Sequence, residues 1–184
     1  MTQETIGKIK QLTELLENAK AEKRPAIRKK IATLLKKNKV DVANDDNLFA
    51  IRSPWGGEVY LVRFRYAVYQ SGAALYLGLD NLDGLDTEDG DASVCWVPYG
   101  DITTFIASDC KRIRICVDTN NMPQAEQLLE ESELAYFWSK YAYSGYCAYP
   151  VYLIDTEVFF KLLMPNATEE EKAQLTKKVF EPET

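Results

Sequence analysis

Two stretches of strict alternation place the tightest limit on how this chain can fold. In segment 58–69, Val62, Phe64 and Val68 fall on one side of an extended chain, and arginines fall on the other. Segment 111–117 repeats the pattern, with isoleucines alternating with arginine and cysteine. A two-residue period is typical of a β-strand with one covered face. The sequence therefore predicts a sheet, and excludes a purely helical bundle.

Further elements follow from turn residues and helix caps. We expect additional strands at 73–79, 92–98 and 149–154, joined by turns short enough for mainly antiparallel pairing. Asn121 with Gln124, and Thr168 with Glu171, have the spacing of a capping box, so each pair should open a helix. Thr156 should cap a short helix that ends near residue 164. The fold class is α+β, with a four- to five-stranded sheet packed by helices.

The first 47 residues differ from the rest in charge and in periodicity. Residues 1–40 hold eleven basic and four acidic side chains, whereas the whole chain has a net charge of −6. Apolar residues recur there at helical spacing on both sides of Pro25, which predicts a helical hairpin. We expect two parts: a basic helical hairpin over 1–47, and an α+β domain with C-terminal helices over 48–184.

Composition limits the chemistry and the location. The chain contains no histidine, and its four cysteines form no CxxC pair, so we expect no metal site and no cofactor. The apolar stretches are interrupted well before the ~20 residues needed to cross a bilayer. The first residues have no signal-peptide pattern. These features favour a cytoplasmic protein without a membrane partner.

Two surfaces are candidates for binding a protein partner. Acidic residues crowd segment 80–91, where the spacing does not fit an EF-hand loop, and they could meet a basic protein surface. Six of the eleven tyrosines lie between residues 136 and 152, in a stretch whose Ser144-Gly145 pair suggests a loop. Half of these tyrosines could simply close the core. The predicted partner-binding residues are Asp83, Asp86, Glu88, Asp89, Tyr136, Trp138, Tyr141 and Tyr143.

Nucleic-acid binding by the N-terminal hairpin is an alternative. Its second helix carries basic side chains around an apolar stripe, and these could neutralise phosphates. The same pattern also fits a solvated helix face, or one that docks on the acidic remainder of the chain. The residues in question are Arg28, Lys29, Lys30, Lys36 and Lys37.

Catalysis is a further alternative, which we expect not to hold. Without histidine, proton transfer would fall to a carboxylate such as Asp118 or Glu126, and a covalent step to Cys147. Asp118, with the two asparagines at 120 and 121, could bind a polar ligand, but such residues more often form a turn and cap a helix. We therefore predict no catalytic residues.

Four sequence segments carry a resemblance to a known family. They are residues 69–75 (YQSGAAL), 89–91 (DGD), 117–126 (VDTNNMPQAE) and 145–152 (GYCAYPVY). Together they resemble the signature of an uncharacterised family found largely on mobile elements of gut bacteria, over roughly residues 60–154. The resemblance implies a phage, plasmid or conjugative-element context, and it transfers no catalytic residues.

The function hypothesis combines this context with the candidate surfaces. We expect a non-enzymatic accessory protein of a phage or mobile element that binds a host or rival macromolecule. Inhibition of a defence nuclease, in the manner of an anti-CRISPR protein, is its most specific form, because an acidic protein can occupy a basic nucleic-acid groove.

Overall fold

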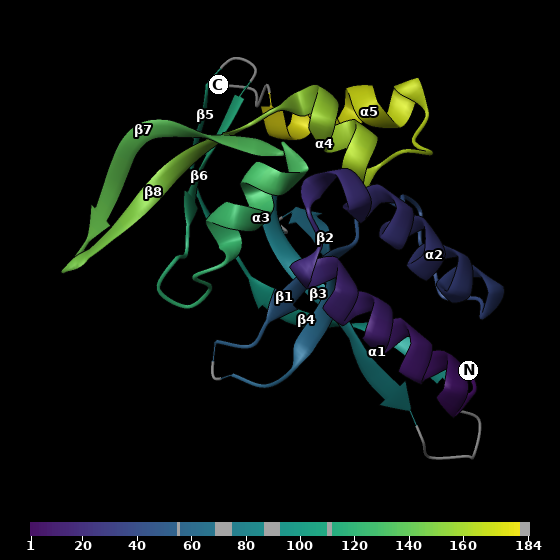
Figure 1. The fold of residues 1–184 in the computed structure, drawn as a ribbon. Coiled ribbons are helices and arrows are strands. Elements are labelled where there is room, and N and C mark those ends of the chain that lie inside the picture. The colour runs from purple at the N-terminus through teal and green to yellow at the C-terminus, as the bar shows by residue number, and fades with distance from the viewer. Residues whose placement is uncertain (55, 69–74, 87–92, 110–111, 181–184) are drawn as a thin grey trace. The chain divides into compact units, whose positions relative to one another are not determined.

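The computed structural model describes residues 1–54, 56–68, 75–86, 93–109 and 112–180, and gives the backbone alone for 83–86, 93–94, 104–109 and 180. The chain divides into two compact units. The first holds Met1–Phe64 and Leu79–Tyr99, and the second holds Arg65–Gly78 and the chain from Gly100 onward. Each unit is considered by itself (Figure 1).

The first unit begins with the predicted helical hairpin. Helix α1 spans Gln3–Asn18 and α2 spans Arg24–Lys37, with a 3-10 turn at Ala21–Lys23 between them. Thr2 caps α1, and Pro25 lies in the first turn of α2, as its fixed φ allows. The two helices contact one another along their length (Figure 1).

The apolar stripe of this hairpin forms a core with the strands that follow it. Ile31 and Leu35 of α2 are fully buried, in one cluster with Leu16, Leu48 and Leu61. Strand β1 (Phe49–Arg52) pairs antiparallel with β2 (Val59–Val68), and the first sheet continues through β3 (Leu75–Asp86) to β4 (Ser93–Asp101). The boundary expected at residue 47 stays a prediction, while the helices share their core with β1 and β2.

Two buried polar side chains in this core form hydrogen bonds with backbone groups. The amide of Asn47 donates to the Phe64 carbonyl at 3.0 Å and accepts from the Phe64 N–H at 2.9 Å, as a neighbouring strand would. The Nε of Arg28 donates to the Leu48 carbonyl at 2.7 Å, and its guanidinium lies 4.8 Å from the centre of the Phe49 ring. Both side chains are buried, so their hydrogen bonds matter more than surface ones would.

The second unit contains a second sheet, with the strand order β5-β6-β8-β7. Its strands are β5 (Thr103–Asp109), β6 (Arg112–Val117), β7 (Ala135–Ser144) and β8 (Cys147–Ile154), and the pairs are antiparallel. Helix α3 (Ala125–Ser132) connects β6 to β7. The isoleucines and valine of β6 are fully buried, whereas its arginines are not, as the alternation predicted.

Helices α4 (Thr156–Leu163) and α5 (Glu169–Leu175) follow this sheet, and a π-helical turn, η2, spans Thr176–Phe180. The capping box of Thr168 and Glu171 is confirmed: the Thr168 hydroxyl accepts from the Glu171 N–H, and the Glu171 carboxylate accepts from the Thr168 N–H. The α+β class, the antiparallel pairing and the N-terminal helical hairpin are also confirmed.

Several local predictions were wrong. The described strands form two sheets, and β5 occupies a stretch for which no element was expected. The tyrosine-rich stretch is strand β7 rather than a loop.

Two expected helix caps also differ. Asp155 caps α4 in place of Thr156. The box of Asn121 and Gln124 does not form: α3 begins at Ala125 without a side-chain cap, and the Asn121 N–H donates to Asp118 instead.

Candidate functional site

Exposed aromatic side chains gather on the β7–β8 hairpin. Of six large hydrophobic side chains that are exposed in the described part of the chain, five lie between residues 136 and 146. The exposed fraction rises from 38% at Phe137 and 54% at Tyr141 to 77% at Tyr143, and Tyr146 at the tip is fully exposed. Such a concentration of uncovered aromatic surface is unusual outside binding sites.

Alternation along β7 divides these aromatics between the two faces of the hairpin. Tyr136 lies opposite Leu153, whereas Tyr141 lies opposite Pro150, and the register shifts between Phe137 and Lys140. Residues directly opposite in an antiparallel pair share a face, and neighbours along a strand alternate. Tyr136 therefore lies on the face of Leu153, while Tyr141 lies on the other face, as does Tyr143 opposite Ala148.

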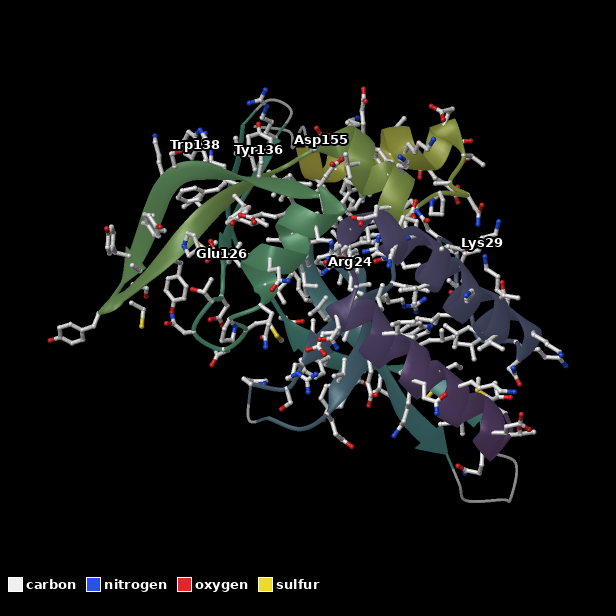
Figure 2. All side chains as sticks on the ribbon, viewed as in Figure 1. Arg24, Lys29, Glu126, Tyr136, Trp138 and Asp155 are labelled. Atoms are coloured by element: carbon white, nitrogen blue, oxygen red, sulfur yellow. The ribbon has the colours of Figure 1, made fainter. Side chains whose placement is uncertain are left out.

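The first of these faces combines aromatic and cationic groups. The Lys140 Nζ lies 3.9 Å from the centre of a Trp138 ring, and the Arg114 Cζ lies 4.9 Å from it. Arg114 is opposite Leu153 in the neighbouring strand pair, which puts it on the same face. Figure 2 shows Trp138 and Tyr136 on the side of β7 away from Glu126. Lys140 and Arg114 were not predicted as site residues. Lys140 follows Trp138 by two residues and Arg114 follows Arg112 by two, and residues at that spacing share one face of a strand.

The second face packs on α3 at its base and is uncovered further out. The Phe137 ring lies 5.7 Å from that of Tyr152 and 5.6 Å from that of Tyr141, centre to centre. The Tyr152 hydroxyl donates to Glu126 of α3 at 3.0 Å. Burial, and then the bond to this carboxylate, raise the pKa of Tyr152 well above its usual range.

Two of the three residues considered for catalysis, Asp118 and Cys147, lie near Tyr149. The Asp118 carboxylate accepts from the Asn121 N–H at 3.1 Å and from the Asn121 side-chain amide at 2.6 Å, which is the turn-forming alternative. A hydrogen bond with the Cys147 side chain raises the pKa of Tyr149, and the nearby negative charge of Asp118 adds to the rise. A raised tyrosine pKa disfavours the phenolate at neutral pH. Glu126 instead faces Tyr152.

The four acidic candidates have side chains outside the described part of the chain. Asp83 and Asp86 belong to β3, but their side chains, with the whole of Glu88 and Asp89, lie outside the described residues. Binding by these four residues stays a prediction.

The basic candidates on α2 differ from one another. Arg28 is buried, with 9% of its surface exposed, and it bonds to the Leu48 carbonyl, so it contributes to the core. Lys36 pairs with Asp45 at 2.6 Å. Lys29, Lys30 and Lys37 are exposed, and Figure 2 shows Lys29 projecting from α2. The exposed cationic set is thus smaller than the predicted one.

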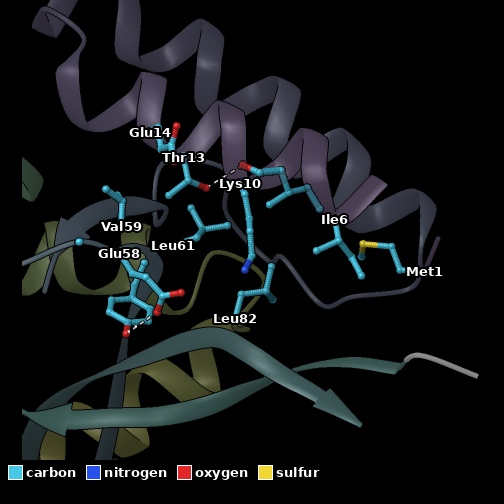
Figure 3. Close-up of a pocket in the computed structure, with 12 residues that line it drawn as sticks. Met1, Ile6, Lys10, Thr13, Glu14, Glu58, Val59, Leu61 and Leu82 are labelled. Carbon is cyan, nitrogen blue, oxygen red and sulfur yellow. Dashed lines mark hydrogen bonds between the residues drawn. The ribbon is translucent and has the colours of Figure 1, made fainter. Parts of the chain in front are cut away.

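The first unit also contains a pocket of about 180 Å³ between α1 and the sheet (Figure 3). Ile6, Ile9 and Lys10 belong to its helical wall, and residues 57–61 with Leu82 form the opposite wall. Ile9 and Leu61 are buried and supply apolar surface, while Lys10, Glu14 and Glu58 supply charged groups. No sequence pattern singled out this pocket, because it depends on how far α1 stands from the strands.

The described part of the chain has neither a metal-binding cluster nor a membrane-spanning helix. Its histidine-free side chains include no group of three or more cysteines and carboxylates placed to hold a metal ion. None of its helices has both the length and the apolar character needed to span a bilayer.

Fold and surface together define an α+β protein with two antiparallel sheets and an aromatic β-hairpin. Residues 67–174, more than half of the 184-residue chain, match the family described as domain of unknown function (DUF4313), and the chain belongs to this family. The expected membership of an uncharacterised family is thus confirmed. No curated protein matches the chain, and no solved structure does.

Proposed function

We propose that this protein acts by binding another protein, without catalysis, and that the β7–β8 hairpin is the contact surface. The observation that carries the proposal is the row of exposed aromatics from Tyr136 to Tyr146. Tyrosine and tryptophan contribute large contact areas at low entropic cost and are enriched where interfaces bind most strongly.

The extension of the hairpin beyond the sheet supports this proposal. Strand β6 pairs with β8 only from Val151 to Leu153, whereas β7 and β8 continue to pair with one another out to Ser144 and Cys147. A two-stranded hairpin is marginally stable in water when nothing covers it. A partner seated against the outer part would bury its tyrosines and stabilise it.

The biological setting of the proposal rests on the sequence resemblance. In this setting, the protein is an accessory of a phage or another mobile element, and its partner is a host or rival protein. Its most specific form is inhibition of a defence nuclease, in which the acidic residues between 80 and 91 would face a basic groove. That surface and the hairpin would then contact the same partner.

Cross-linking from the hairpin tests the contact surface. A photo-reactive phenylalanine in place of Tyr143 should yield one discrete adduct in lysate of a bacterium that carries a defence nuclease. Untagged wild-type protein should compete for that adduct, and a Y141S/Y143S double variant should not. Leu15→Ser is the matched control, because Leu15 is also 54% exposed but lies on α1. Equal competition by all three proteins would reject the hairpin as the interface.

Nucleic-acid binding through α2 is the second candidate, supported by the exposed Lys29, Lys30 and Lys37. Affinity for a DNA or RNA duplex should then fall steeply between ~50 and ~200 mM salt. Lys29→Gln with Lys30→Gln should reduce the salt slope, whereas Y141S/Y143S should leave it unchanged. Absence of any binding at ~50 mM salt would reject this candidate.

A further inference from the structure

The pocket between α1 and the sheet combines apolar side chains with side chains of both charges. Ile9 and Leu61 are at most 5% exposed, and Ile6 and Leu82 are partly buried. Lys10 lines the pocket from α1, and Glu58 lines it from the segment that leads into β2. Every lining residue belongs to the first unit, so the pocket is complete within it.

Lys10 is directed into this pocket rather than along its helix. Glu14 follows it by four residues, a spacing at which a lysine and a glutamate can pair on a helix surface. On the same helix, Lys8 does pair with Glu4, at 2.5 Å. Lys10 forms no ion pair within the described residues, and Figure 3 shows its side chain crossing the pocket toward Leu82. Its ammonium group is therefore available to an anionic group in the pocket.

The opposite wall offers the complementary charge. The Glu58 carboxylate accepts a hydrogen bond from the Tyr60 hydroxyl at 3.0 Å, which fixes it beside the apolar interior. A purely anionic ligand would be repelled by this carboxylate, and a purely cationic one by Lys10. A ligand that carries both charges on a short apolar group satisfies both walls.

We propose that this pocket binds a free α-amino acid with an apolar side chain. The α-carboxylate would pair with Lys10, the α-ammonium with Glu58, and the side chain would lie against Ile9, Leu61 and Leu82. The size agrees, since an apolar cavity of ~150 Å³ accommodates benzene, and this pocket measures about 180 Å³. A phenyl-sized side chain thus fits. This site is independent of the hairpin.

Three matched probes test the two charge contacts with the full chain by titration calorimetry. L-phenylalanine carries both charges, 3-phenylpropionate lacks the ammonium, and phenethylamine lacks the carboxylate. L-phenylalanine should bind most tightly, and each truncated probe should bind about fivefold more weakly, as expected for a partly exposed ion pair. Binding of either truncated probe as tight as that of L-phenylalanine, or no binding of any, would overturn the proposal.

Two variants assign the contacts to their residues. Lys10→Gln should weaken L-phenylalanine about fivefold and leave phenethylamine unchanged, because only the carboxylate contact is lost. Glu58→Gln should weaken L-phenylalanine similarly and leave 3-phenylpropionate no weaker than before. Lys29→Gln, on an exposed position of α2, is the control and should change nothing. If Lys10→Gln and Glu58→Gln leave L-phenylalanine binding intact while melting temperatures are unchanged, the ligand lies elsewhere.

Discussion

The chain contains two hairpins, one of which buries its apolar side chains while the other exposes them. In the α1–α2 hairpin, isoleucines and leucines such as Ile31 and Leu35 are fully buried in the core of the first unit. In the β7–β8 hairpin, Tyr141 and Tyr143 are more than half exposed. Aliphatic side chains gain only from leaving water, whereas a tyrosine has a hydroxyl that water can solvate. The first hairpin therefore stabilises the fold, whereas the second leaves its tyrosines in contact with water, as the proposed partner contact requires.

The largest expected effect separates the two hairpins by stability. Ile31→Ala removes a side chain with no exposed surface and should lower the free energy of unfolding by about 2–5 kcal/mol. Tyr143→Ala should change it by less than about 0.5 kcal/mol, because that side chain is 77% exposed. Urea denaturation followed by circular dichroism measures both. A loss above about 2 kcal/mol for Tyr143→Ala would mean that the second hairpin is also part of a core.

Within the helical hairpin, the next effect distinguishes a buried cation from an exposed one. Arg28→Ala leaves the Leu48 carbonyl without its donor and should cost about 1.5–3 kcal/mol of unfolding free energy. Lys29→Ala, one residue along the helix and exposed, should cost less than about 0.5 kcal/mol. Equal costs in the same denaturation experiment would contradict a structural role for Arg28, and would return it to the candidate nucleic-acid surface.

These contrasts also show what a single sequence reveals. The alternation in segments 58–69 and 111–117 correctly predicted β2 and β6, because Val62 and Phe64, like the isoleucines of β6, are more deeply buried than the arginines between them. The paired signals of Thr168 and Glu171 predicted the start of α5, because both partners of a capping box lie within one helical turn.

The sequence was misleading where the stabilising contacts come from distant residues. Strand β7 has exposed residues on both faces and a bulge at Ser139, so it has no two-residue period, and its pairing with β8 is what makes it a strand. Asn121 bonds to Asp118 in the turn before α3, so the expected box with Gln124 does not form. Within the candidate site, the grouping of Trp138 with Arg114 follows from a register that no local pattern encodes.

A smaller effect is expected on the cationic face of the strand hairpin. Lys140→Ala removes a cation from above the Trp138 ring and should cost about 0.5–1 kcal/mol of unfolding free energy. Lys140→Arg should restore most of it, because a guanidinium also stacks on indole. Lys178→Ala, at an exposed position of η2, is a control with a lysine from another element of the same unit. If Lys140→Arg is as destabilising as Lys140→Ala, a cation above the Trp138 ring is not what stabilises the hairpin.

The smallest effect concerns the base of the strand hairpin and appears only at alkaline pH. Burial is the main cause of the raised pKa of Tyr152, and the bond to Glu126 is the next. The neutral phenol is thus favoured in the folded chain, whereas in the unfolded chain Tyr152 ionises near pH ~10. Its stabilising contribution is therefore complete below that value and is lost as the pH rises through it toward the folded pKa. Titration of phenolate absorbance should show Tyr152 ionising only above the pH of ~10 that is typical of a free tyrosine. Glu126→Gln should lower the pKa of Tyr152 without returning it to its ordinary value, since burial remains, and Glu130→Gln should lower it less. If Tyr152 ionised near pH ~10 in the wild-type protein, the base of the second hairpin would be as open to water as its tip.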